Sequence, residues 1–530
     1  MNNSITVMKF GGTSVDSIDQ VIDLVDKESH DSQPIAVVSA FSGNTNELNK
    51  ISKQILYHPK GLKCKRDLTE LIKTSTTSVL AKVEAKFSTL FPTVPAPELE
   101  KFTNLYLKPQ LSHIIEHAAE PVWGILLNES EITPEQQTFI EDRLISRGEV
   151  YAGYLLAELH NHARRSAKPW LPIDLSELFS NNYLAPKNLS KTALIQLMIE
   201  KIRFHLRGGI EQFTPILSGH VGYLPGGIIQ MIDRGYTDFT AAMTSVAAKD
   251  LLISQRKFDI HALPEIVEQH VRLEIWKEVP GLLSIDPRVV EGEDYSKEPF
   301  HELNQFKKAQ LRTAVSYKEA AEMASLGGMK AINPKGIKVL RHQGIPLSVK
   351  NTYEPELPGT NITEQEDLDN PGIRFISAKS DQSVISIEDP DMDEEKGVAA
   401  KILQKCSDLG VSVGAITTSE TNISLSIDSK HKNKLLLVEQ LKSLEGLKDE
   451  LEVELTDNLA MVCLIGNSMR NQVGILANVF RILANANINI LFDCGHPDRN
   501  ITLIIEQKDL QKALQVLHHD LIEQPLLSNS

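Results

Sequence analysis

Several short segments place glycine beside a cation or an acid where a strand gives way to a helix. Lys9-Phe10-Gly11-Gly12-Thr13-Ser14 follows β-prone residues and precedes a helical pattern that begins near Val21. Glycines in such a turn let the backbone approach an oxyanion closely, and the first N–H groups of the following helix can donate to it. Lys9 adds a positive charge, so the segment suits a phosphate group. It is neither a Walker A loop nor a GxGxxG fingerprint.

Similar segments recur along the chain, and each also has a plain structural explanation. Residues Ser39–Thr45 form a second turn with small hydroxyl residues, Glu149 follows a glycine, and Asp233–Asp238 holds one base and two acids. Taken singly, these are a turn, a solvated acid and a helix N-cap. Together with the cations Lys277 and Lys330, they predict a site for a small anionic molecule at the C-terminal edge of a parallel sheet.

The elements that would position these segments alternate between strands and helices. The sequence predicts strands at 5–10, 34–40, 172–174, 214–217, 273–276 and 345–349. This alternation is typical of an α/β domain with a mainly parallel central sheet and helices on both faces. Residues from about 59 to 143 differ, because they read as mostly helical with proline breaks at Pro92, Pro95 and Pro97. We expect a helical elaboration within this domain.

The C-terminal part has a different organisation. Residues 354–372 are rich in proline and acids without periodicity, which predicts a linker. Two similar stretches follow, each with a β-α-β-β pattern. The sequence therefore predicts a catalytic domain at 1–353, a linker at 354–372, and small α+β modules at 373–455 and 456–530. Such a repeat describes a fold and does not by itself give a function.

Composition excludes several classes of protein. The net charge of −15 over 530 residues argues against a nucleic-acid binder that uses a basic surface. No apolar run approaches the roughly 20 residues of a membrane span, and the N-terminus has no secretory pattern, so we expect a cytoplasmic protein without a membrane partner. The four cysteines form no CxxC pair and the histidines show no zinc-ligand spacing, so no metal site is predicted.

Six segments, taken in order, resemble the aspartate kinases of the amino-acid kinase superfamily. The C-terminal modules are similar to the tandem ACT domains of that family, so the resemblance covers nearly the whole chain. The segments are KFGGTSV at 9–15, VVSAFSGNTNEL at 37–48, SRGE at 146–149, RGYTD at 234–238, WKEVPGLLSIDPRVV at 276–290 and SYKEAAEMASLGGMKAINP at 316–334.

The resemblance implies a fold and a reaction. The fold would be that of an amino-acid kinase followed by two ACT domains. The reaction would be phosphorylation of the β-carboxylate of L-aspartate by ATP, with Mg²⁺ carried by the nucleotide rather than by a protein metal site. The product would be 4-phospho-L-aspartate, the start of lysine, threonine, methionine or ectoine biosynthesis. A carboxylate is already ionised at neutral pH, so catalysis would rest on positioning and charge rather than on a general base.

The resemblance also implies roles for the residues around the phosphates. Lys9 would contact the transferring phosphoryl group, and Asp238 would orient Lys9. Lys330 matches a second catalytic cation. The nucleotide positions of the family correspond to Lys9, Gly11, Gly12, Ser39, Lys277, Glu278, Leu283, Asp286, Arg288 and Lys330.

A second set of residues matches the family's aspartate site. Arg234 would hold the α-carboxylate of the substrate as a fork, and Glu149 would meet its α-ammonium. Thr45 and Thr237 complete the match. Tyr236 stands where the family more often has glycine, and Lys277-Glu278 replaces its common Thr-Asp, but neither change removes a reacting charge.

Two alternatives remain open from the sequence. The chain could be a catalytically silent amino-acid sensor that kept the ACT pair and lost turnover, or another kinase of the superfamily acting on glutamate or UMP. The presence of Lys9, Glu149, Arg234 and Asp238 favours an aspartate kinase over a silent sensor.

The regulatory half carries its own expectations. Gly414 stands where lysine-sensitive members often have aspartate, so we expect weak or absent inhibition by lysine. The ACT resemblance implies an amino-acid effector and a homodimer or a dimer of dimers. The segment from Ser468 to Gly474 after the first strand of the second module either lines a ligand site or is an ordinary loop.

Overall fold

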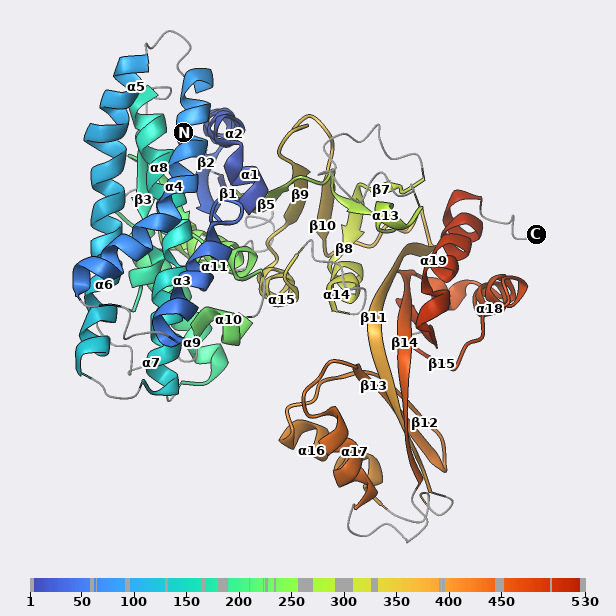
Figure 1. Cartoon of the computed structure of the whole chain (residues 1–530). Coiled ribbons are helices and arrows are strands. Elements are labelled where there is room, and N and C mark those ends of the chain that lie inside the picture. Colours follow the sequence, from blue (N-terminus) through green and yellow to red (C-terminus); the bar gives the residue numbers. More distant parts are fainter. Residues whose placement is uncertain are drawn as a thin grey trace. The chain divides into compact units, whose positions relative to one another are not determined.

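The chain packs as two compact units (Figure 1). Unit 1 comprises residues 1–282, 299–303 and 332–364, and unit 2 comprises 283–298, 304–331 and 365–530. The computed structural model describes residues 4–57, 62, 64–90, 96–128, 132–163, 168–179, 189–208, 210–222, 224, 227–232, 235–255, 270–290, 308–325, 332–389, 392, 396–443, 452–495 and 498–524.

Unit 1 is built on a mainly parallel sheet, as predicted. Its strand order is β3-β4-β2-β1-β5-β9-β10, and only β10 runs antiparallel to its neighbour β9. The strands are β1 (Ile5–Phe10), β2 (Gln33–Val38), β3 (Trp170–Ile173), β4 (Thr214–Ser218), β5 (Val271–Lys277), β9 (Leu347–Asn351) and β10 (Thr360–Thr363). The parallel strands bring their carboxyl ends to one edge of the sheet. The glycine-containing segments predicted to form a site for an anionic molecule were expected at this edge.

Strand β1 places core side chains on one face of the sheet and the candidate site residue Lys9 on the other. All six of its residues are buried, as a strand covered on both faces requires. Met8 and Phe10 belong to a core that includes residues of α2 (Ile18–Asp31) and α8 (Arg147–Ala163). Successive side chains of a strand alternate between faces, so Lys9 points to the opposite face. That face is packed against α11 (Tyr236–Gln255).

The remaining described helices of unit 1 connect and cover these strands. Helix α1 begins at Gly12, directly after the predicted glycine turn. Helix α15 has Asn333 as its N-cap, with Oδ1 accepting from Lys335 N at 2.9 Å, and Gly344 in the left-handed conformation as its C-cap. These helices are α1 (Gly12–Asp16), α3 (Asn44–Tyr57), η3 (Leu175–Glu177), α9 (Lys191–Leu206), α10 (Gly227–Ile232) and α15 (Pro334–Gln343).

The segment for which a helical elaboration was expected contains several helices in its described residues. Leu68, Ile72 and Leu111 from its helices enter the same core as Phe10, so the elaboration is part of unit 1. It consists of α4 (Lys65–Leu90), α5 (Ala96–Phe102), the π-helix η2 (Thr103–Leu107), α6 (Lys108–Asn128) and α7 (Pro134–Ile145) (Figure 1).

Unit 2 contains a sheet in the order β12-β13-β11-β14-β16-β15. Its two longest strands, β11 and β14, run antiparallel through both C-terminal modules (Figure 1). The strands are β11 (Gly372–Glu388), β12 (Val413–Thr418), β13 (Asn422–Asp428), β14 (Glu452–Asn467), β15 (Phe492–Cys494) and β16 (Asn500–Glu506).

This sharing of strands differs from the expected division at 373–455 and 456–530. The first half of β11 pairs with the second half of β14, beside β16, whereas its second half pairs with β13 and the first half of β14. The first module is therefore nested within the second. Each module also has a second helix after its last strand, which the β-α-β-β pattern did not include.

The C-terminal modules contain the expected helix after each first strand, α16 and α18, together with further helices. They are α16 (Val398–Asp408), α17 (Lys434–Lys442), η8 (Met469–Asn471), α18 (Ile475–Asn485), η9 (Gln507–Asp509), α19 (Leu510–His518) and η10 (His519–Glu523). Earlier elements in the same unit are α13 (Pro287–Val290), β7 (Leu311–Arg312), β8 (Ala314–Ser316) and α14 (Tyr317–Ser325). A two-residue strand, β6 (Leu282–Leu283), lies where the chain passes from unit 1 to unit 2.

Two expected boundaries therefore change. Residues 283–298 and 304–331 were expected in the catalytic domain but group with unit 2. A buried ion pair explains part of this, because Arg374 of β11 lies 3.0 Å from Glu319 of α14. The expected linker at 354–372 contains β10, in which Thr360 and Ile362 are buried and alternate with half-exposed or exposed residues.

None of the helices in the described ranges combines the length and the apolar character needed to cross a bilayer.

Candidate active site

Two lysines share one carboxylate at the carboxyl ends of β1 and β5. Lys9 Nζ lies 2.7 Å from Asp238 Oδ1, and Lys277 Nζ lies 3.7 Å from Asp238 Oδ2. Asp238 is in the first turn of α11, where the helix dipole favours a negative charge. The pairing of Lys9 with Asp238 agrees with the orienting role expected for this carboxylate. Lys277 was expected only as a nucleotide contact.

The cluster is electrostatically unbalanced. Burial raises the pKa of the Asp238 carboxyl, but Lys277 and Lys9 reverse this effect and hold it below its usual value. Burial lowers the pKa of Lys277, and Asp238 opposes that shift. One carboxylate between two lysines leaves a surplus of positive charge in a site almost closed to water, where charge interactions are strong. Such a surplus suits a ligand with several negative charges.

The predicted glycine turn lies close to the Lys9 ammonium group. A Cβ placed on Gly11 would lie 3.8 Å from Lys9 Nζ, and one on Gly12 would lie 3.0 Å from the Ala40 carbonyl oxygen, so the turn is closely packed. The Gly11 N–H donates to the Trp276 carbonyl at 3.3 Å. A phosphate cradle at this turn would therefore depend on the N–H groups that begin α1 at Gly12.

Side chains on both sides hold this turn in place. Thr13 Oγ1 donates to Glu278 Oε2 at 2.8 Å, and Ser14 Oγ donates to the Trp276 carbonyl at 3.2 Å. Thr352, after β9, donates to Ser14 Oγ at 2.8 Å. Glu278 is thus tied to the glycine turn, which is compatible with its expected place near the nucleotide.

Glu149 and Thr237 form the centre of a second cluster at the same edge. The Thr237 hydroxyl donates to Glu149 Oε1 at 3.0 Å, and Ser39 Oγ donates to Thr237 Oγ1 at 3.2 Å. The other oxygen, Glu149 Oε2, is buried and has no hydrogen-bond partner in the described part of the chain. A buried carboxylate oxygen of this kind can accept a hydrogen bond from a ligand. Residues expected at the aspartate and nucleotide positions are thereby brought together.

The surroundings of Glu149 shift its acidity. Burial raises the pKa of the Glu149 carboxyl to about 7, although His220, Thr237, Tyr236 and Lys9 all act to lower it. The Tyr236 phenol contributes to this lowering without forming a hydrogen bond of normal geometry to Oε2. Glu149 would therefore change its charge near neutral pH in the absence of a ligand.

A buried histidine stands behind Glu149. Burial by itself would lower the pKa of His220, but the Asp142 carboxylate, 3.2 Å from its Nε2, and Glu149 raise it. The His220 ring also meets the Tyr236 ring edge-on, with centroids 5.2 Å apart. The cluster thus places the His220 imidazole between two acids in the interior of unit 1, and both acids favour its protonated form.

Close backbone approach positions Glu149. A Cβ on Gly148 would lie 2.8 Å from both Asn44 Oδ1 and Ala40 Cβ, so only glycine fits between α8 and the start of α3. Thr45 follows Asn44 in the first turn of α3 and is half-buried. The sequence SRGE therefore needs its glycine for packing, and the acid gains its position from that contact.

Some expected site residues are not placed in this cluster. Arg234 and Lys330 lie outside the described residues. Leu283, Asp286 and Arg288 belong to unit 2, where Arg288 Nε donates to Asp286 Oδ1 at 3.0 Å. Their expected roles in nucleotide binding stay predictions.

Sequence reasoning missed three contributors to the site. Gly219 approaches so closely that a Cβ would lie 2.2 Å from Thr237 Cγ2, and His220 follows it. Asp142 completes the set through His220. Gly219 and His220 come within three residues of the end of the predicted strand 214–217, so their place at the sheet edge was available as a signal. Nothing in the sequence around Asp142 indicated its role.

No group of three or more potential metal ligands from His, Cys, Asp and Glu occurs in the described ranges.

Comparisons with known proteins show the relationship. A family model described as "ACT domain" matches residues 385–436 and 462–521. Aspartokinase 2, chloroplastic, of Arabidopsis thaliana is 25% identical over 527 residues, covering 98% of this chain and 84% of the relative. The lysine-sensitive aspartokinase 3 of Escherichia coli is 25% identical over 531 residues, covering 98% of this chain and 100% of the relative. Over nearly its whole length the chain is thus homologous to aspartokinases, and its C-terminal part matches the ACT domain.

A solved structure supports the same fold. The crystal structure of E. coli aspartokinase III in complex with aspartate and ADP has a TM-score of 0.65 to this chain at 23% identity, and covers 98% of this chain and 99% of that one. The expected fold, an amino-acid kinase domain with ACT modules, is confirmed. So is the expected function of an aspartate kinase at the level of the family.

Proposed function

We propose that the chain transfers the γ-phosphoryl group of ATP to the β-carboxylate of L-aspartate at the carboxyl edge of the unit 1 sheet. The observation that carries this assignment to residues is the pair of buried clusters there. One has surplus positive charge at Lys9 and Lys277, and the other has an unpartnered acceptor at Glu149 Oε2. The first suits a polyphosphate and the second suits an ammonium group.

The transfer step needs charge stabilisation more than proton transfer. A β-carboxylate oxygen attacks the γ-phosphorus, the bond to the β,γ-bridging oxygen breaks, and ADP leaves with that electron pair. Lys9, held by Asp238, would meet the negative charge on the transferring group, and Lys277 would add to it. Gly12 and the start of α1 would supply backbone donors. Mg²⁺ would arrive with ATP, and the phosphate oxygens would be its principal ligands.

Substrate recognition would use the second cluster. The α-ammonium of aspartate would bind Glu149 Oε2, while Thr237 holds the other carboxylate oxygen in place. Pairing with an ammonium lowers the pKa of a carboxyl, so bound aspartate would keep Glu149 ionised. Arg234 and Thr45 would complete the site at the substrate α-carboxylate, and Lys330 would add a further cation near the phosphates.

Trapping the acyl phosphate tests this proposal directly. Purified protein would be given MgATP, hydroxylamine and L-aspartate at about 10 mM, well above the usual range of KM values. We expect aspartate-dependent hydroxamate that disappears in Lys9→Ala. The matched control is Lys27→Ala, which removes an exposed lysine paired with Glu356 and should keep full activity. Product from L-glutamate in place of aspartate, or product retained in Lys9→Ala, would contradict the assignment.

The first C-terminal module bears on regulation by lysine. A Cβ on Gly414 would lie 2.9 Å from Ser426 Oγ and 3.2 Å from Met461 Cε. An aspartate at this position would have to displace these two side chains, and glycine itself supplies no carboxylate partner for a lysine side chain. Lysine inhibition would therefore be weak, unlike that of the relative whose name describes it as lysine-sensitive. Half-inhibition below about 1 mM lysine would contradict this.

Assembly through the C-terminal modules is also part of the proposal. Exposed apolar side chains occur on α17 and α18, where Leu435 and Leu476 are 66% and 43% exposed. Such side chains favour contact with another surface. We expect at least a homodimer by light scattering, and a Leu435→Glu, Leu476→Glu double variant should weaken it. A monomer at micromolar concentration would contradict this expectation.

A further inference from the structure

Helix α4 of the helical elaboration presents one face to the turns of the candidate active site. Ser75, Val79 and Lys82 follow one another at spacings of four and three residues, which places them on the same side of the helix. Val79 is buried in the same core as Phe10. The Ser75 carbonyl and the Lys82 ammonium each bond to the segment 39–45. Helix α4 therefore contacts the site as well as extending the domain.

Lys82 joins two segments that are far apart in the sequence. Its Nζ lies 2.9 Å from each carboxylate oxygen of Asp16 and donates to the Ser42 carbonyl at 2.8 Å. Asp16 is the last residue of α1, which begins at Gly12, and Ser42 lies in the turn of residues 39–45. An ammonium group has three N–H donors, and here they are directed at both turns.

The two turns also contact each other directly. The Ser42 N–H donates to Asp16 Oδ1 at 3.0 Å, so Lys82, Asp16 and Ser42 form a closed ring of hydrogen bonds. A Cβ on Gly12 would lie 3.0 Å from the Ala40 carbonyl oxygen, which leaves little space between the turns. The separation of the two turns is therefore set by close packing on one side and by this ring on the other.

A second contact from α4 orients the start of α3. Asn44 is buried, and its Nδ2 donates to the Ser75 carbonyl at 2.7 Å. Thr45, which is expected at the aspartate site, is the next residue in the chain. Because Ser75 and Lys82 are seven residues apart, α4 holds the segment 39–45 at two points about two helical turns apart.

The Lys82 contacts would contribute little to the stability of the fold. The side chains of Lys82 and Asp16 are 33% and 28% exposed, and ion pairs with this much access to water add little to the free energy of unfolding. Catalysis is more sensitive to geometry, because a displacement of about 1 Å between reacting groups can cost about a hundredfold in rate. The ring should therefore matter more for the relative position of the turns than for folding.

We propose that Lys82 is a positioning residue for phosphoryl transfer, because it fixes the distance between the turn that begins at Gly12 and the turn that leads to Thr45. The inference rests on the proposed function, which places the phosphates at the first turn and aspartate at the second. Lys82 acts through Asp16 and Ser42 and contacts neither substrate. Without it each turn still binds its substrate, but the carboxylate and the γ-phosphorus no longer meet at the distance that transfer needs.

The first test separates positioning from binding in the full-length protein. Lys82→Met keeps the aliphatic stem and removes the ammonium, and we expect kcat for aspartate-dependent hydroxamate to fall about tenfold to a hundredfold. The dissociation constants of the β,γ-imido analogue of MgATP and of L-aspartate, each measured alone by calorimetry, should stay as in the parent. Lys73→Met is the matched control on the same helix, since Lys73 is paired with Glu70 within α4 and should not affect kcat.

Two outcomes of this test would overturn the proposal. An unchanged kcat in Lys82→Met would mean that the ring does not position the reacting groups. Loss of binding of the nucleotide analogue alone would make Lys82 a ligand of the nucleotide rather than a positioning residue.

Further variants ask whether the effect passes through Asp16. Lys82→Arg keeps a cation that can bond to the same carboxylate, so it should recover most of kcat. Asp16→Asn retains an oxygen for the Ser42 N–H but loses the charge, and it should also lower kcat. The double variant Lys82→Met, Asp16→Asn should be no slower than Lys82→Met, because both changes remove one interaction. Additive losses would overturn the ring as the cause.

Amide hydrogen exchange decides the inference even if the protein does not phosphorylate aspartate. Residues 12–16 and 39–45 should exchange faster in Lys82→Met than in the parent, because the ring that protects the Ser42 N–H is opened. In Lys73→Met they should exchange at the rate of the parent. A parent that forms no hydroxamate would contradict the proposed function alone. Unchanged exchange of both segments in Lys82→Met would overturn the role of Lys82, whatever the activity.

Discussion

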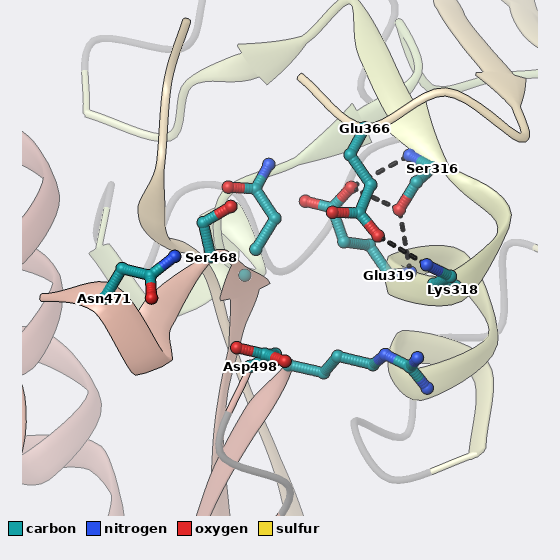
Figure 2. Close-up of a pocket in the computed structure, with 10 residues that line it drawn as sticks. Ser316, Lys318, Glu319, Glu366, Ser468, Asn471 and Asp498 are labelled. Carbon is teal, nitrogen blue, oxygen red and sulfur yellow. Dashed lines mark hydrogen bonds and ion pairs between the residues drawn. The ribbon is translucent and has the colours of Figure 1, made fainter. Parts of the chain in front are cut away.

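The edge of the unit 1 sheet and the part of unit 2 around α14 both gather charged residues, but the two regions balance these charges differently. In unit 1 one carboxylate, Asp238, faces two lysines, and all three groups are largely withdrawn from water. In unit 2 the acid Glu319 is paired with Arg374, which lies 3.0 Å away. Glu366 is paired with Lys318 at 2.7 Å, as Figure 2 shows. Surplus buried charge suits a multiply charged phosphate, whereas the paired charges of unit 2 suit a structural role.

Of the variants considered, removal of the Asp238 carboxylate should have the largest effect on activity. Asp238→Asn leaves Lys9 and Lys277 buried side by side without an acid, so Lys9 loses its position and one lysine loses its proton. We expect kcat to fall about a thousandfold, the scale for a lost preorganised charge. Hydroxamate formation measures this, with the exposed Asp23→Asn as the control. Retention of more than about a tenth of the activity would show that the two lysines do not need Asp238.

The charges of unit 2 should matter for stability rather than for turnover. Arg374→Met leaves Glu319 buried without its ion pair, and we expect unfolding to become easier by about 3 kcal/mol. Chemical denaturation would be followed alongside Arg481→Met, an exposed arginine of the same unit. An unchanged denaturation midpoint would mean that the pair is not a structural element of unit 2.

Glu149→Gln sharpens the comparison because it changes charge without changing shape. The ammonium of aspartate would lose its ionic partner, so kcat/KM for aspartate should fall about a hundredfold while KM for ATP changes little. Glu158→Gln, on the same helix and half-buried, is the control. An equal rise in both KM values would place Glu149 outside the aspartate site.

The pH dependence follows from the raised pKa of Glu149. In the proposed site the unprotonated form would bind the ammonium, so kcat/KM for aspartate should be level above pH 7. Below its pKa of about 7, it should fall roughly tenfold per unit. The kcat should fall less steeply, because bound aspartate keeps the carboxylate ionised. A kcat/KM that stays flat down to pH 5.5 would contradict a pKa near 7.

The smallest expected effect comes from Tyr236. Its phenol lowers the pKa of Glu149, so Tyr236→Phe should move the inflection of the kcat/KM profile to higher pH. The activity at pH 8 should change little, and the activity at pH 6 should fall a few-fold. A downward move of the inflection would reverse the sign of this argument.

The contrast also shows what the sequence could foretell. The glycine turn after Phe10 and the acid in the RGYTD segment predicted which groups meet, because parallel strands end at one edge. The pairing of Lys277 with Asp238 was not predictable, since it depends on β5 lying directly beside β1. Asp142 was missed for the same reason, because its partner His220 lies 78 residues further along the chain.

The architecture of unit 2 was only half predictable. The local pattern of strand, helix and two strands identified both modules. The same pattern arises whether two modules follow one another or one is inserted into the other. Whether the modules are successive or one is inserted into the other depends on the long-range register of β11 with β14. The pairing of Ile376 with Leu464 is an example, and no local sequence pattern predicts it.

Because β11 and β14 run through both modules, the first module is an insertion that could be deleted from the second. Gln382 and Leu459 face each other across β11 and β14, at the point where one module ends and the other begins. A two-residue hairpin turn could join the chain there, and the whole first module would be absent while the second kept all of its strands. The polypeptide thus enters and leaves the first module at two neighbouring positions. Recombination at these positions could therefore exchange the whole module.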